Sequence, residues 1–152
     1  MNLPEQIKNF VNQRIVLDNY CLPHFYPTPE SFQDFQAGYK FNPVTGENLT
    51  GEDKGDFKSN WYVICSAYAD DPFFVDFTES SENYPVYFAW HGAGDWEPLK
   101  VANSITDFSN KLQLLKLIET KGENIQNEIE KNFDMNLEFW REVYDEYTEY
   151  DE

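Results

Sequence analysis

The sequence predicts an α+β fold, in which an antiparallel sheet of about five or six strands is flanked by N-terminal and C-terminal helices. Short runs rich in aromatic and β-branched residues follow one another between residues 37 and 102. The segments that join them are short, which favours antiparallel neighbours. Apolar residues at helical spacing stand before and after this region. We expect residues 1–152 to form one domain with an acidic helical extension from about residue 119.

The first predicted element is a short amphipathic helix over residues 3–14. Pro4 suits its first turn, and Ile7, Phe10 and Val11 recur on one face. Three prolines then interrupt NYCLPHFYPTPE, which excludes a regular helix there. We expect an ordered loop instead, held by three aromatic side chains: Tyr20, Phe25 and Tyr26.

Five segments have the composition of strands. They are residues 37–41, 61–68, 72–77, 84–91 and 96–102. The polar, glycine-containing segment between the first two is predicted to be a long hairpin loop. In YPVYFAWH the side chains of Val86, Phe88 and Trp90 alternate with those of Tyr87 and Ala89, so both faces are apolar. This strand is therefore expected to be central and covered on both sides. The last predicted strand contains Pro98, which indicates an edge or a bulge.

A helix is predicted to begin at Ser104. Asp107 follows three residues later, an acidic variant of the capping box, and Gly122 is a typical stop. Two more apolar stripes follow, with a break near residues 132–136. Residues 119–152 hold twelve acidic and three basic residues, a net charge of −9. Because Trp140 and Tyr144 continue an apolar stripe, we expect this acidic tail to dock on the domain.

The charge of the whole chain restricts its partners. Twenty-eight acidic residues face eleven Lys and Arg, which gives a net charge of −17. Nucleic acid and anionic membrane surfaces are disfavoured, because both require positive protein surface. A basic protein partner suits this field, although acidity can also serve solubility alone.

The compartment is predicted from the start of the chain and its cysteines. The opening MNLPEQIKNF is unlike a signal peptide, and no apolar run approaches the roughly 20 residues that span a bilayer. Two cysteines do not make a disulfide framework. We therefore expect a cytoplasmic protein.

The motifs that carry catalysis or cofactors are weak. The glycines of GAG at residues 92–94 lie between predicted strands with no Lys-Ser/Thr pair after them, which favours a turn over a phosphate loop. Cys21 and His24 could form a nucleophile and base, but no orienting group is evident. Two histidines do not supply a zinc site. We predict no catalytic residue, no cofactor and no metal.

Three aspartates are compatible with more than one kind of site. Asp70, Asp71 and Asp76 could be calcium ligands or paired acids, although the EF-hand spacing is absent. A glycosidase-type pair of acids also remains open, since nothing in the sequence singles one out. The simpler interpretation of Asp76 is a strand-end carboxylate that meets a backbone amide or a lysine.

The order of several segments resembles that of a known superfamily. The segments are GYKF at 38–41, WYVI at 61–64, DPFFVD at 71–76, PVYF at 85–88, HG at 91–92, DWE at 95–97 and ANSITDF at 102–108. In this order they resemble the SUKH superfamily, the fold of the yeast cell-wall-assembly regulators and of many bacterial toxin-immunity proteins. The resemblance covers roughly residues 37–118 and is a pattern of strands and aromatics rather than a catalytic signature.

The resemblance implies an α+β domain that binds without catalysis. In bacteria such proteins look like cytoplasmic antidotes that hold a toxin domain, often a nuclease. A nuclease must be basic to hold nucleic acid, so an acidic inhibitor fits it. Our leading hypothesis is therefore an immunity protein. The competing hypotheses are a regulatory scaffold, as the yeast relatives are thought to be, and an enzyme.

The predicted contact residues lie in the three turns that join the strands between residues 61 and 102. They are Asp70, Asp71, Glu79, Glu82, Asp95, Trp96 and Glu97. Antiparallel connection places the first and third turns at one end of the sheet, so their four acids should cluster, and the two glutamates of the second turn should stand apart. Trp96 is predicted to be the apolar anchor beside the cluster.

Overall fold

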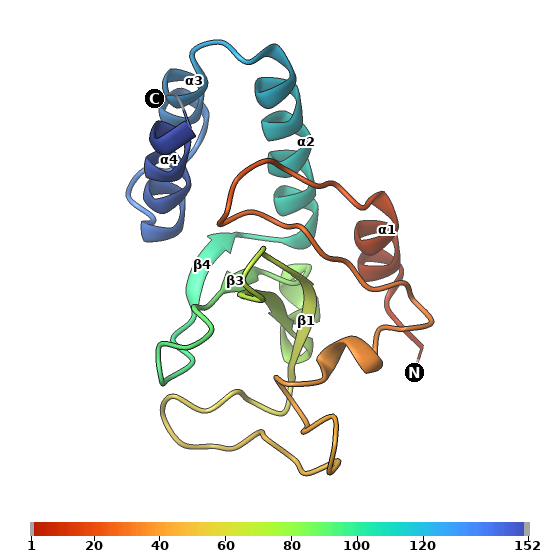
Figure 1. Cartoon of the computed structure of the whole chain (residues 1–152). Helices are drawn as coiled ribbons and strands as arrows, with labels where there is room; N and C mark the ends of the chain where they lie inside the picture. Colours follow the sequence, from red (N-terminus) through yellow and green to blue (C-terminus); the bar gives the residue numbers. More distant parts are fainter. Residues whose placement is uncertain (1, 151–152) are drawn as a thin grey trace.

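The computed structural model describes residues 2–150 and is an α+β fold (Figure 1). Its elements are α1 (Glu5–Gln13), η1 (Asp34–Gln36), β1 (Trp61–Ser66), β2 (Pro72–Asp76), η2 (Phe77–Glu82), β3 (Val86–Phe88), β4 (Leu99–Ala102), α2 (Ile105–Lys121), α3 (Ile125–Asn132) and α4 (Glu138–Tyr150), where η marks a 3₁₀ helix. The strands form one antiparallel sheet in the order β1-β2-β3-β4. The predicted class is confirmed, but the sheet of the described chain has four strands, not five or six.

The strand predicted at residues 37–41 is the one that is missing. η1 comes directly before it, and Gly38 then turns the backbone at φ +88°, which ends any extended run. Only isolated bridges involve this segment, one of which joins Ala37 to Phe41. The alternation of AGYKF is therefore a coincidence of composition.

Other groups cover the edge of β1 that a fifth strand would have paired. The Gln36 side-chain amide donates to the carbonyl of Val63 over 3.0 Å and accepts from its N–H over 2.8 Å, as a neighbouring strand would. Phe25 and Ser66 exchange two backbone hydrogen bonds. The Lys40 ammonium donates to the carbonyl of Trp61 over 2.9 Å. The edge is thus closed to pairing with another chain.

The N-terminal segment follows the prediction in its helix and partly in its loop. α1 buries Ile7, Phe10 and Val11 as expected. Of the three aromatic side chains predicted to hold the proline-rich loop, only Tyr26 is buried, and its hydroxyl donates to the carbonyl of Ile15. Tyr20 and Phe25 were expected to hold the loop in the same way, but both are exposed (40% and 45%).

The helices pack on one face of the sheet and share a single cluster of buried side chains with it (Figure 1). Val86 and Phe88 of β3 point into this cluster, while Tyr87 and Ala89 point to the opposite face. β3 lies between β2 and β4, so the predicted central strand with two apolar faces is confirmed. Trp90 packs against the helical side from a partly buried position.

The C-terminal helices begin, end and dock as the sequence predicts. The Ser104 hydroxyl accepts a hydrogen bond from the N–H of Asp107 at 3.0 Å, and Gly122 ends α2 in the left-handed conformation. The break between the last two helices falls at residues 133–137. Trp140 is fully buried, and Tyr144 packs against the same cluster, so both contribute to the core.

Candidate partner-binding face

The sheet face opposite the helices is covered by loops rather than helices. The chain between residues 35 and 57 crosses this face, and Phe57 packs there on Phe74 at a ring-centroid distance of 5.4 Å. Val63 and Ala89 complete the small cluster from the sheet. This second cluster has room for only a few side chains, so several aromatic rings around it remain partly exposed.

Trp96 is one of these rings, and two loops position it. The backbone N–H of Trp96 donates to the carbonyl of Gly55 over 2.9 Å, and the Trp96 ring lies 5.5 Å from that of Phe57 and 5.7 Å from that of His91. Gly55 has φ +91°, and a Cβ there would stand 2.7 Å from Oδ1 of Asp95. Only glycine therefore allows the loop at 51–57 to meet the loop at 91–98 so closely.

Two neighbouring hollows on this face form what we call the Trp61–Trp96 groove. The first has a volume of about 400 Å³, and its walls include Asp56, Trp61, Asp95, Trp96, Glu97 and Pro98. The second, about 240 Å³, shares Trp61 and Pro98 and adds Phe74, Asp76, Glu79 and Tyr87. The groove therefore has aromatic walls and an acidic rim. Lys54 and Lys58 are the two basic residues in its walls.

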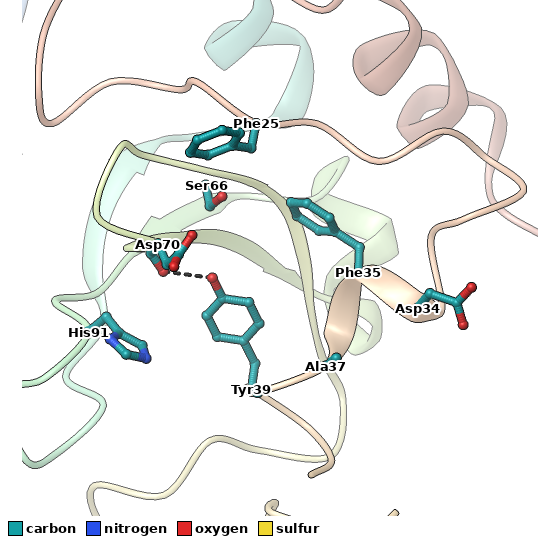
Figure 2. A pocket seen from close by; sticks show the side chains of 9 residues that line it. Phe25, Asp34, Phe35, Ala37, Tyr39, Ser66, Asp70 and His91 are labelled. Atoms are coloured by element: carbon teal, nitrogen blue, oxygen red, sulfur yellow. Dashed lines mark hydrogen bonds between the residues drawn. The ribbon is translucent and has the colours of Figure 1, made fainter. Parts of the chain in front are cut away.

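Three of the predicted contact residues line the first hollow of this groove together, namely Asp95, Trp96 and Glu97, and Glu79 lines the second. Asp70 lies in a separate hollow with Tyr39 and His91 (Figure 2). The rings of Tyr39 and Trp96 are 5.9 Å apart, and His91 contacts both. Asp70 thus lies in one hollow and Asp95 and Glu97 lie in another, rather than in one cluster.

Asp71 was predicted to be a surface contact residue, but the structure buries it. It is 3% exposed, and its Oδ1 accepts a hydrogen bond of 2.7 Å from the N–H of His91. Burial raises the pKa of Asp71 above its ordinary value, while the hydrogen bond from His91 acts in the opposite direction. Asp71 was predicted to meet a partner; in the structure it is turned away from solvent, and its contact joins the first turn to the third.

The two glutamates of the second turn separate from each other. Glu79 accepts a hydrogen bond from the Tyr87 hydroxyl at 3.0 Å and borders the groove. Glu82 is exposed, and the Ser81 hydroxyl donates to it. Because the loop at 91–98 folds back across the sheet, Glu79 shares the groove with Pro98 instead of standing apart. Burial and the contact with Glu79 raise the pKa of Tyr87 to about 12.

A comparison with family models identifies the chain. The model of the SMI1 / KNR4 family (SUKH-1) matches residues 1–111. The chain belongs to the SMI1 / KNR4 family. The match includes α1, the whole sheet, the Trp61–Trp96 groove and the hollow that holds Asp70. It begins at residue 1, whereas the resemblance seen in the sequence begins near residue 37. Most of α2 and all of α3 and α4 lie beyond it. No curated protein matches the chain, and neither does any solved structure.

The surface of this family member has few internal ion pairs. Between described side chains there is one, Lys111 with Asp107 at 2.8 Å. The acids on the rim of the groove are therefore not neutralised by ion pairs among the described side chains. Lys58 turns its ammonium to the main-chain carbonyl of Asp53. The rim thus presents net negative charge to whatever approaches the aromatic walls.

The cysteines, the histidine near Cys21 and the candidate metal ligands can each be placed in the structure. Both thiols are buried, and burial raises the pKa of Cys65 well above its ordinary value. Nδ1 of His24 lies 2.8 Å from the carbonyl of Leu22. Among the described residues, no group of three His, Cys, Asp or Glu side chains could hold a metal ion. Within residues 2–150, no helix combines the length and apolar character needed to cross a bilayer.

Sequence reasoning missed two parts of the groove. Trp61 was predicted only as a strand residue, although it forms a wall of both hollows. Asp56 lies in a segment predicted to be a long hairpin loop. The useful signal was Phe57, a lone aromatic residue after a polar glycine-containing stretch, since a large apolar side chain ending a loop favours docking on the sheet.

Proposed function

We propose that this protein is a non-catalytic binding protein that holds a basic protein partner, and that it acts as an immunity protein against a bacterial toxin domain. One observation carries the proposal: the partly exposed ring of Trp96 lies in a groove with Asp56, Asp95 and Glu97, and no ion pair between described side chains neutralises these acids. Membership of the SMI1 / KNR4 family supports a binding role. The cytoplasm is the proposed compartment.

The two parts of the groove have different energetic tasks. Desolvated aromatic side chains carry most of the energy of a protein interface, so Trp96 and Trp61 are the proposed anchors. Rim charges mainly raise the rate of encounter with an oppositely charged partner. A toxin that cleaves nucleic acid must present basic surface, which an acidic rim attracts and occupies.

The second candidate function is regulation of cellular proteins by the same kind of binding. It rests on membership of the family. The superfamily that the sequence resembles includes regulators as well as immunity proteins. The two functions differ in the partner. A basic, conditionally toxic protein encoded beside this chain favours immunity, whereas a set of cellular partners without such a neighbour favours regulation.

The decisive experiment identifies the partner by affinity capture and then measures both rate constants at two salt concentrations. Charge reversal at Asp95 and Glu97 should slow association and flatten its salt dependence. Trp96→Ala should mainly speed dissociation, provided that circular dichroism shows an intact fold. Glu123→Lys, in the turn between α2 and α3, is the matched control and should change neither rate. Association that ignores both salt and the two reversals would refute the proposed acidic interface.

A further inference from the structure

A second aromatic surface lies at one end of the sheet, beside the turn that joins β1 to β2. Tyr20, Phe25 and Tyr68 are 40%, 45% and 64% exposed. The rings of Tyr20 and Tyr68 are 5.8 Å apart, and His24 lies 5.7 Å from Tyr68 and 6.4 Å from Phe25. Single exposed aromatics are ordinary, but a contiguous group of them marks a surface that contacts another molecule.

This surface continues into a hollow of about 440 Å³, which we call the Asp70 pocket. Phe25 belongs to both, and Phe35, Tyr39, Ser66, Asp70 and His91 also line the pocket. Figure 2 shows the rings of Phe25, Phe35 and Tyr39 around the hollow, with Asp70 and His91 across from Phe35. The Asp34 carboxylate, although near, points away from these side chains.

The turn that carries Asp70 holds this residue in one place. Its backbone is left-handed at φ +66°, its N–H donates to the carbonyl of Ala67 at 3.0 Å, and its own carbonyl accepts from the Tyr39 hydroxyl at 2.6 Å. The carboxylate takes no part in these bonds. No described side chain forms an ion pair with it, and no Lys or Arg lines the pocket.

Aromatic faces beside an unneutralised carboxylate select a cation. A guanidinium fits better than an ammonium, because its planar group stacks on rings, is weakly hydrated and donates two parallel hydrogen bonds to a carboxylate. We infer that the Asp70 pocket binds an arginine side chain of the basic partner, stacked on Phe25 or Phe35 and hydrogen-bonded to Asp70. The inference rests on the proposed function for the partner, but the site is separate from the Trp61–Trp96 groove.

Small probes test the pocket without any knowledge of the partner. The capped tripeptide glycyl-arginyl-glycine is titrated into the protein and followed by NMR, with its citrulline and lysine counterparts as matched probes. Citrulline keeps the shape of arginine but carries no charge. We expect saturable shifts at Phe25, Tyr39 and Asp70 with the arginine peptide, weaker binding of the lysine peptide and no saturable shifts with citrulline.

Two variants locate the binding. Asp70→Asn removes the charge and tolerates a positive φ, and Phe25→Ala shortens an exposed ring, so both should leave the fold intact. Each should weaken the arginine peptide about tenfold. Glu123→Gln is the control acid and should leave its affinity unchanged. Equal binding of arginine and citrulline, equal binding of arginine and lysine, or full affinity in Asp70→Asn would overturn the inference.

The same variants separate this inference from the proposed function. If the captured partner is basic and binds through the groove, but tolerates both Asp70→Asn and Phe25→Ala without loss of affinity, the arginine site is wrong and the binding function stands. If the arginine peptide binds as expected while no basic protein is captured, the site stands and the proposed function fails.

Discussion

The indole N–H of Trp140 donates a hydrogen bond of 2.9 Å to the main-chain carbonyl of Val101, in the edge strand β4. Trp140 is fully buried, with its ring 4.6 Å from Phe133 and 4.9 Å from Phe139. A helix that lies beyond the family match thus closes the outer edge of the family's sheet. Side chains therefore protect both edges, Gln36 at β1 and Trp140 at β4.

Substitution of Trp140 should separate packing from hydrogen bonding. Trp140→Ala should lower the free energy of unfolding by about 3–5 kcal/mol, because it leaves a large cavity in the core. Trp140→Phe keeps most of the ring but leaves the carbonyl of Val101 without its donor, at a cost of about 1–3 kcal/mol. Urea unfolding measures both, and Leu117→Ala, at an exposed position of α2, is the control. Equal costs for the two variants would contradict this assignment.

Truncation after Lys121 tests whether the acidic helices are part of the folded core. Ile129, Phe139, Trp140 and Val143 are buried in the cluster that contains the sheet. Their removal exposes the apolar surface of α2 and β4 to water, so the melting temperature should fall markedly. Differential scanning calorimetry gives the result. An unchanged melting temperature would show that the tail is an independent appendage.

The Gln36 side chain should stabilise the edge of β1 by making the hydrogen bonds that a neighbouring strand would make. Gln36→Ala leaves the N–H and carbonyl of Val63 unpaired at a buried position, so the free energy of unfolding should fall by about 1–3 kcal/mol. Amide hydrogen exchange at Val63 should accelerate in the variant, whereas amides of β3 should change little. Gln6→Ala on the exposed side of α1 is the control. Unaltered exchange at Val63 would count against the edge contact.

Asp71 should tolerate loss of its charge better than loss of its oxygen. Asp71→Asn keeps an acceptor for the N–H of His91, and burial already favours the neutral form, so stability should change by less than about 0.5 kcal/mol. Asp71→Ala removes the acceptor and should cost about 1–3 kcal/mol. Chemical denaturation compares the two. A larger loss in the asparagine variant would mean that the carboxylate charge itself holds the turns together.

The raised pKa of Tyr87 leads to a prediction of how the free energy of unfolding changes at alkaline pH. The folded state raises its pKa from 10.0 to about 12, so the unfolded chain loses this proton first as the pH rises. The stabilisation is complete below pH 10 and is lost as the pH rises to about 12. Unfolding curves across this window should therefore show a shallower decline for Tyr87→Phe than for the wild type. Parallel declines would indicate that Tyr87 ionises as easily in the folded protein as in the unfolded chain.

Features of the fold that depend on neighbouring residues in the sequence could be predicted. The capping pair Ser104 and Asp107, the stop at Gly122 and the apolar stripe of α1 are all local patterns, and the structure confirms each one. The two-faced strand β3 was predicted because side-chain alternation has a period of two. The acidic character of the surface follows from composition alone.

The candidate site could be predicted only in part. Trp96 was singled out because an aromatic residue among acids in a turn is typical of an interface anchor, and it lies beside Asp95 and Glu97 in the groove. Trp61 was not singled out, because its exposure depends on how a loop crosses the sheet. The inward turn of Asp71 toward the N–H of His91 joins residues of different turns and has no local signal.

The sequence by itself determined the α+β class, the start and end of α2, the antiparallel order and the negative charge, since each of these is encoded in spacing or composition over a few residues. Only the tertiary structure decided that the sheet of the described chain stops at four strands, that Asp71 is buried, and that loops and aromatics build a groove and a pocket on its far side. Those outcomes depend on contacts such as Gln36 with Val63, which lie 27 residues apart. Such contacts form because a polar group that is buried in the folded chain must find its hydrogen-bond partner within the protein, and that partner can come from a distant segment.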